Sequence, residues 1–106
     1  MKKELRSAGK FDRKLASLFE ALEGREKELQ SRLDELVKGL LDGGIAKAAV
    51  HHPTDETCCL PLIDNYVVVF RPDKSVAAGQ DKTGRDIVEF SGAKMFDLLN
   101  VEDEQG

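Results

Sequence analysis

The stretch FDRKLASLFEALEGREKELQSRLDELVKGLL, residues 11–41, decides the fold that the sequence predicts. Its apolar residues recur at intervals of three, four or seven positions, which is the repeat of an amphipathic helix. The apolar stripe consists of Phe11, Leu15, Leu18, Leu22, Leu29, Leu33, Leu36 and Leu40, and it is widened by Phe19, Val37 and Leu41. One face of this segment should therefore be buried against something apolar.

Gly24 lies near the middle of this stretch and leaves two interpretations open. The segment is either one continuous helix or a helical hairpin that turns within residues 22–28. Glu23 and Lys27 form a favourable pair four positions apart across Gly24, and no Pro or Asn stands nearby, which favours the continuous helix. At 1.5 Å per residue such a helix would be about 45 Å long, whereas a domain of this size has a radius of gyration of about 13 Å. We therefore expect part of the stripe to extend beyond the domain.

An overhanging apolar stripe needs a second helix to cover it. The eight stripe residues from Phe11 to Leu40 are therefore the predicted interface of a homodimer, held by helix contacts of the coiled-coil type. The apolar gap between Leu22 and Leu29 shifts the heptad phase, so a long regular parallel coil is not implied. Whether the two helices run parallel or antiparallel stays open.

After Gly43 and Gly44 the pattern changes to that of strands. Residues 45–52, 57–63, 66–70 and 86–90 are short runs rich in Val, Ile, Ala or Phe, and Ser91 could cap a short helix over residues 91–99. The sequence thus predicts an α+β protein: a long N-terminal amphipathic helix, a small antiparallel sheet of three to four strands and a short C-terminal helix. The parts are residues 1–41 (helix, oligomerisation), 42–100 (sheet and C-terminal helix) and 101–106 (acidic tail).

Composition excludes several classes of protein. The chain has 106 residues and a net charge of −4, which suits one small domain and disfavours nucleic acid as the primary ligand. It contains no apolar run of the ~18 residues needed to span a bilayer, and its basic start lacks the apolar region of a secretory signal. We expect a cytoplasmic protein that does not contact a membrane.

Four residue positions carry the side chains that zinc prefers. These candidate metal ligands are His51, His52, Cys58 and Cys59, with Asp55 and Glu56 between them. Adjacent residues of a strand point to opposite faces, so two adjacent pairs fit poorly around one ion. Nothing nearby in the sequence marks either thiol as an activated nucleophile. We therefore expect no cofactor and no catalytic residue, and a metal-binding regulator is kept as an alternative.

Residues 71–85 form a polar segment that the pattern predicts to be a long loop. Loops of this length often contact partners. The candidate partner-binding residues in it are Arg71, Lys74, Lys82 and Arg85. An acidic surface elsewhere on the domain could also contact a basic partner.

The run NYVVVFR, residues 65–71, resembles the central strand of the RelE/ParE toxin superfamily. The resemblance implies a small ribonuclease toxin in which Tyr66, Arg71, Lys74, Lys82, Arg85 and the histidines act on RNA. Those toxins place a strand before their helices, and the sequence predicts none here. The acidic charge also opposes RNA binding.

Together these patterns favour a non-enzymatic protein-binding module, an adaptor or a small inhibitor of a larger enzyme, that self-associates through its N-terminal helix. A RelE/ParE-like ribonuclease and a metal-binding regulator are the alternatives. The identity of the partner does not follow from the sequence.

Overall fold

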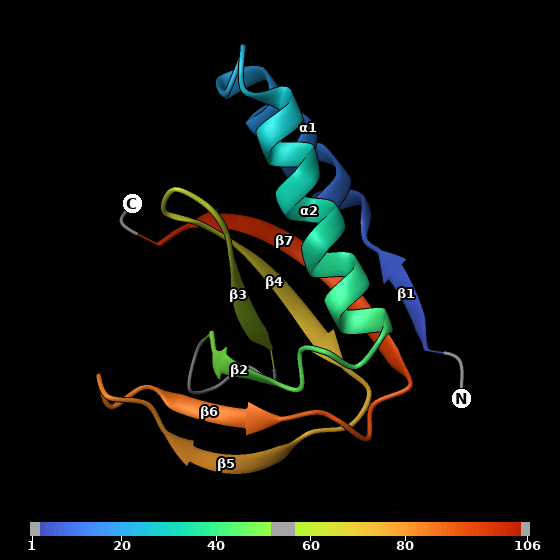
Figure 1. Ribbon diagram of the computed structural model, residues 1–106, viewed down its shortest axis with the longest axis vertical. Coiled ribbons are helices and arrows are strands. Elements are labelled where there is room, and N and C mark those ends of the chain that lie inside the picture. The colour runs from blue at the N-terminus through green and yellow to red at the C-terminus, as the bar shows by residue number, and fades with distance from the viewer. Residues whose placement is uncertain (1–2, 52–56, 105–106) are drawn as a thin grey trace.

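A computed structural model describes residues 3–51 and 57–104. The elements follow in the order β1 (Glu4–Ser7), α1 (Gly9–Ala21), α2 (Glu26–Leu41), β2 (Lys47–Val50), β3 (Cys58–Ile63), β4 (Tyr66–Pro72), β5 (Val76–Gln80), β6 (Asp86–Glu89) and β7 (Met95–Asp103). Within the described residues, the strands form one seven-stranded sheet in the order β1-β7-β4-β3-β2-β6-β5 (Figure 1). Neighbouring strands are antiparallel except β1 and β7, which are parallel.

The predicted continuous helix is wrong, because the chain turns back between α1 and α2. Gly24 has φ +90, a left-handed conformation that side chains with a Cβ rarely adopt. The turn is closed by the Arg25 N–H, which donates to the Leu22 carbonyl (2.8 Å), and by the Gly24 N–H, which donates to the Glu26 carboxylate (2.9 Å). A charge pair such as Glu23 with Lys27 is worth about 0.2–0.5 kcal/mol. Burying one leucine is worth about 1.5–3 kcal/mol, so the hairpin that buries both helices prevails.

The apolar stripe becomes the core of a single chain. Phe11, Leu18, Leu29, Leu36 and Leu40 are buried, with Leu29 and Leu40 at 0% exposure, and Leu15, Leu22 and Leu33 pack partly buried against the same cluster. α2 has 16 residues and is thus about 24 Å long, a length that the sheet can cover. The expected overhang does not arise.

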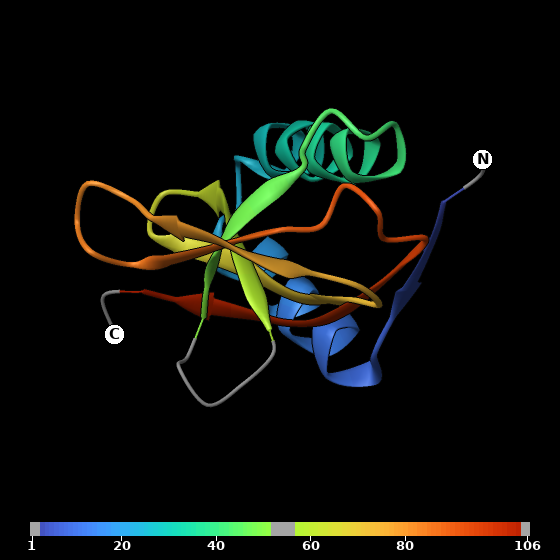
Figure 2. The ribbon, with the colours of Figure 1, turned by 90° about the horizontal axis from the view of Figure 1, so that it is seen from below.

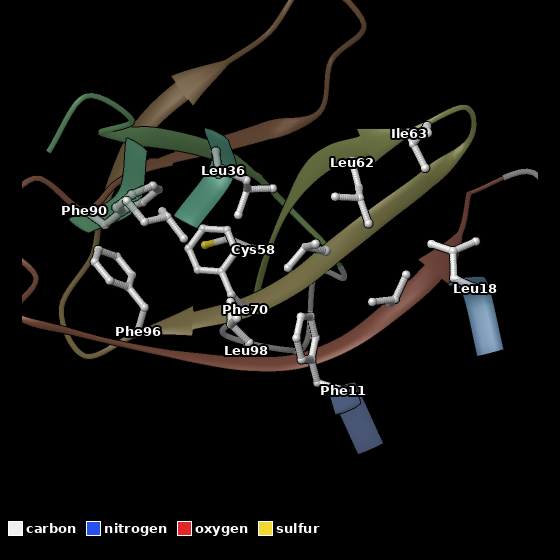
Figure 3. Close-up of a cluster of buried hydrophobic side chains, with 14 of the residues drawn as sticks. Phe11, Leu18, Leu36, Cys58, Leu62, Ile63, Phe70, Phe90, Phe96 and Leu98 are labelled. Atoms are coloured by element: carbon white, nitrogen blue, oxygen red, sulfur yellow. The ribbon is translucent and has the colours of Figure 1, made fainter. Parts of the chain in front are cut away.

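One face of the sheet receives both helices. Cys58 and Leu62 of β3, Phe70 of β4 and Leu98 of β7 point into the cluster that also contains Phe11 and Leu36 (Figure 3). Phe70, Phe90 and Phe96 pack edge to face in the same cluster, with ring centroids 5.4 to 6.1 Å apart. We call this the helix-covered face of the sheet.

The predicted sheet was too small and the predicted C-terminal helix was wrong. β7 occupies residues 95–103, where a helix and an acidic tail were expected. Buried Phe96 and Leu98 stand two positions apart, the period of a strand, and both pack in the core. Ser91 does not cap a helix, because its hydroxyl donates to the Glu89 carboxylate (3.0 Å).

Two further strands lie where the sequence predicted none. β1 precedes the helices, and β5 lies within the segment 71–85 that was predicted to be a loop. Both are edge strands of the sheet. The α+β class itself agrees with the structure, since helices and strands are segregated along the chain. Neither described helix is long and apolar enough to cross a membrane.

Replacing Gly24 by alanine should change the free energy of unfolding in opposite directions for a hairpin and for a continuous helix. No atom lies within 4 Å of a Cβ added at Gly24, so Gly24→Ala should cost only the left-handed backbone strain, about 1 kcal/mol of unfolding free energy. In a continuous helix the same change would stabilise by about 1 kcal/mol. Urea denaturation of the unmodified chain and of Gly24→Ala measures the change in unfolding free energy.

Gly9→Ala is the matched control. Gly9 begins α1 without a positive φ, and its added Cβ would meet only the end of the flexible Arg13 side chain, at 3.3 Å. The variant should be neutral or stabilised by about 0.5 kcal/mol. A Gly24→Ala protein that is as stable as Gly9→Ala, or more so, would contradict the hairpin.

Candidate interaction surfaces

The face of the sheet opposite the helices carries a small apolar cluster of its own. Cys59, Val67 and Val69 are each 5% exposed, and Ala49 packs against them. We call this the open face. The Cys59 thiol on this face donates a weak hydrogen bond to the Glu104 carboxylate (3.8 Å).

A polar cluster of five residues joins β7 to β2 and to the start of β6 on the open face. It consists of His51, Arg85, Asn100, Glu102 and Glu104. The His51 imidazole pairs with the Glu102 carboxylate, which also accepts a hydrogen bond from the Asn100 amide (2.9 Å). Arg85 pairs with Glu104 (3.0 Å). β4 and β3 separate β7 from β2 in the sheet, so the contact between His51 and Glu102 depends on the twist and curvature of the sheet.

Two hollows adjoin this polar cluster. One of about 390 Å³ is lined by Lys47, Cys59, Tyr66, Arg85 and Glu104, among others. The other, of about 420 Å³, is lined by His51, Arg85 and the turn that joins β5 to β6. Hydrogen bonding to Glu104, followed by its charge, raises the pKa of Arg85, so the guanidinium stays charged. An imidazole and a guanidinium thus border one hollow, and each is already paired with a carboxylate.

The two thiols are poor nucleophiles and poor metal ligands. Burial, with a smaller contribution from Cys59, raises the pKa of Cys58 to about 11. Burial is also the main cause of the raised pKa of Cys59, followed by the negative charge of Glu104. Cys58 points into the core and Cys59 lies on the open face, so one ion could not bind both. Both thiols therefore stay protonated near neutral pH.

The described residues contain no group of three His, Cys, Asp or Glu side chains that could hold a metal ion. His52, Asp55 and Glu56 lie outside the described residues. Among the candidate ligands that are described, His51 pairs with Glu102 rather than with a thiol.

The predicted partner-binding residues fall at two separate places. Arg71 and Lys74 lie before β5, and Lys82 and Arg85 lie after it, in the turn that precedes β6. The structure therefore does not bring these four residues into one site. The association of Arg85 with His51 comes from the fold of the sheet, and no spacing in the sequence indicates it.

Most of the predicted dimer interface lies in the core of one chain. Five of the eight stripe residues are buried, and Leu15, Leu22 and Leu33 are partly buried against the same cluster. Self-association would have to use another surface.

The open edges of the sheet are the features that sequence reasoning missed. All five residues of β5 are exposed, and Val76 is 58% exposed. At the other end, β1 pairs only with residues 95–98 of β7, so that within the described residues no strand lies beside the same edge at residues 99–103. A groove of about 690 Å³ separates this edge from α1. The signal for β5 was the uncharged run VAAGQ between two Asp-Lys pairs.

Comparisons of the chain with protein-family models, with curated protein sequences and with solved structures found no significant match.

The raised pKa of Cys58 predicts a loss of stability at alkaline pH. Because the folded state holds this proton up to about pH 11 while the unfolded thiol loses it near pH 9, the folded state binds more protons between these values. The unfolding free energy should therefore fall as the pH rises from 9 towards 11. Urea denaturation across this range measures the fall.

Cys58→Val, which keeps the side chain apolar and similar in volume, should show a smaller fall over the same pH range. Other titrating groups contribute equally to both proteins, so the difference isolates Cys58. Equal slopes for the two proteins, or rapid reaction of the native thiols with an alkylating reagent at pH 8, would contradict this account of the thiols.

Proposed function

We propose that the chain is a non-enzymatic protein-binding module, an adaptor or a small inhibitor, that binds an extended segment of its partner at β5. The observation that carries this proposal is an exposed, uncharged strand at an open edge of the sheet. Such an edge offers unpaired backbone N–H and C=O groups, to which an extended peptide can add as a further strand.

β5 lacks two of the features that commonly protect an edge strand, charge and proline. Gly79 has φ +104, and the register with β6 is irregular between Ala77 and Gln80. The regular pairing with β6 is therefore confined to Val76 and Ala77, so the partner segment that pairs with this edge should be short.

A hollow beside β5 could receive side chains of the partner segment. Its volume is about 520 Å³, and its apolar walls are Val50, Ala77, Ile87 and Val88. Thr57 also lines this hollow, and its buried hydroxyl has no hydrogen-bond partner among the described residues. Backbone pairing at the edge would supply affinity, and apolar side chains in the hollow would supply specificity.

A photo-crosslinking amino acid in place of Ala78 tests this proposal in the organism that makes the chain. It should give one discrete protein adduct, which mass spectrometry identifies. Val76→Lys places a charge on the edge and should weaken binding of that partner about tenfold. Ser31→Lys adds the same charge on the exposed surface of α2 and is the matched control.

Failure to obtain a discrete adduct at position 78 would contradict partner binding at β5. An adduct whose yield is the same in the Val76→Lys and Ser31→Lys proteins would do so as well.

A second candidate function, RNA cleavage of the RelE/ParE kind, is favoured by two observations. β1 precedes the helical hairpin, as the initial strand does in that superfamily, and His51 with its partner Glu102 borders the same hollow as Arg85. An imidazole held by a carboxylate can take a proton from a ribose hydroxyl, and a guanidinium can stabilise charge on phosphate. Against this candidate, Arg85 is already paired with Glu104, and the chain carries a net charge of −4.

Incubation of the purified chain with RNA decides between the two candidates. We expect no cleavage above the buffer control, because Arg85, the guanidinium at this hollow, is already paired with Glu104 and the chain carries a net charge of −4. Cleavage by the unmodified chain that disappears in both His51→Ala and Arg85→Ala, but not in Lys27→Ala on α2, would establish the ribonuclease instead.

A further inference from the structure

We propose that the hollow beside β5 binds one long basic side chain, a lysine or an arginine, of the partner's extended segment. This inference rests on the proposed function and deepens it, because it names the chemistry that selects the partner. The aliphatic stem of the basic side chain would lie on the apolar walls of the hollow, and its charged head would pair with Asp86.

The hollow has room for a long side chain that enters from the edge of the sheet. Its volume is about 520 Å³, and it is bordered by β5, β6, the end of β2 and the start of β3. Ala77 and Gly79 line it from β5, and neither has a side chain beyond Cβ. A side chain from a segment added beside β5 can therefore pass across this strand.

The entrance to the hollow is accessible to a partner. All five residues of β5 are exposed, and the turn that joins β5 to β6 lies at the margin of the molecule opposite to β1 (Figure 2). No residue of α1 or α2 lines the hollow. A segment that pairs with β5 would therefore not have to displace a helix.

The charge of the hollow is negative. Asp86 is the one charged residue that lines it within residues 3–51 and 57–104. The Asp86 carboxylate accepts a hydrogen bond from the Gln80 amide (3.1 Å), and it forms no ion pair with the residues that the structure describes. A cationic occupant would complement this charge.

The two cations nearest in the fold do not neutralise Asp86. His51 and Arg85 border a second hollow that Asp86 also lines. His51 pairs with Glu102, and Arg85 pairs with Glu104 (3.0 Å). Both cations belong to the polar cluster of the open face, and neither lines the hollow beside β5.

The other polar side chains of the hollow can all accept hydrogen bonds. Thr57 and Ser75 carry hydroxyls, and Gln80 keeps its amide oxygen while its amide nitrogen donates to Asp86. The Thr57 hydroxyl is buried and has no hydrogen-bond partner among the described residues. An ammonium or a guanidinium group only donates, so it is matched to a site of acceptors.

The distance from the edge selects a long side chain. Adjacent strands lie about 4.8 Å apart, so a segment added beside β5 would run about 10 Å from β6, which carries Asp86. A short side chain would end above β5, whereas the stem of lysine or arginine spans most of this distance. Asp86 would repel an acidic side chain, and an apolar one would not use its charge.

Titration of the full chain with n-butylguanidinium tests the inference, because this cation reproduces an arginine side chain without a backbone. Nuclear magnetic resonance spectra should show saturable shifts at the amides of Ala77, Asp86 and Val88, with a Kd of about 10 mM or tighter. At equal ionic strength, n-butanol and pentanoate should bind at least about tenfold more weakly, because neither can pair with a carboxylate.

Three variants assign the binding to the hollow. Asp86→Asn keeps an oxygen that can accept from Gln80 but removes the charge, and it should weaken binding about tenfold. Asp42→Asn removes the same charge at the end of α2 and is the matched control, which should bind like the unmodified chain. Ala77→Leu fills the path across β5 without a change of charge and should abolish binding.

Shifts that do not saturate, or equal binding by the unmodified chain and Asp86→Asn, would overturn the inference. Equal affinity for n-butanol would do so as well, because the hollow would then not select a cation. The titration concerns the hollow alone, so its result is independent of the crosslink at Ala78 that tests the proposed function. A crosslinked partner segment without lysine or arginine would overturn this inference and leave the proposed function in place.

Discussion

The packing of two short helices on one face of the sheet is the interaction on which the remaining structure depends. Both helices can reach that face because Gly24 reverses the chain in a left-handed conformation. Phe11 and Leu18 from α1 and Leu29, Leu36 and Leu40 from α2 then enter the same cluster as Phe70 and Leu98 of the sheet. Without the reversal, one half of the apolar stripe would stay in water.

Helices and strands were predicted better from the sequence than the way in which they pack against one another. The strand 66–70 and the helical periodicity of residues 11–41 were identified correctly, because each depends on the spacing of neighbouring side chains. The direction of the chain at Gly24 depends on the burial that both helices gain against a sheet formed later in the chain. Charge pairs along the helix are too weak to oppose that gain.

The C-terminal segment was misassigned for a related reason. Met95, Leu98 and Leu99 also fit one side of a helix, and only pairing with β4 selects the strand. β1 and β5 are likewise specified by the strands beside them, β7 and β6, more than by their own composition. The polar cluster of the open face could not be predicted, because His51 and Glu102 meet only when the sheet is curved. These tertiary effects explain why the predicted dimer interface became a core.

The two ends of the sheet differ in the kind of contact they suit. β5 is exposed and uncharged, which suits a partner whose extended segment supplies both backbone groups and apolar side chains. The edge of β7 adjoins α1, and basic residues of the helix and acidic residues of the strand line one groove of the same chain.

The central claim is that the leucines of α1 and α2 cover the sheet of their own chain. Isotope-filtered nuclear Overhauser spectra of a mixture of ¹³C-labelled and unlabelled chains test it directly. We expect contacts from the methyl groups of Leu18, Leu36 and Leu40 to Val101, Cys58 and Phe90 within the labelled chain only. Contacts from these methyl groups to protons of the unlabelled chain would show that the apolar stripe joins two copies, and would contradict the account.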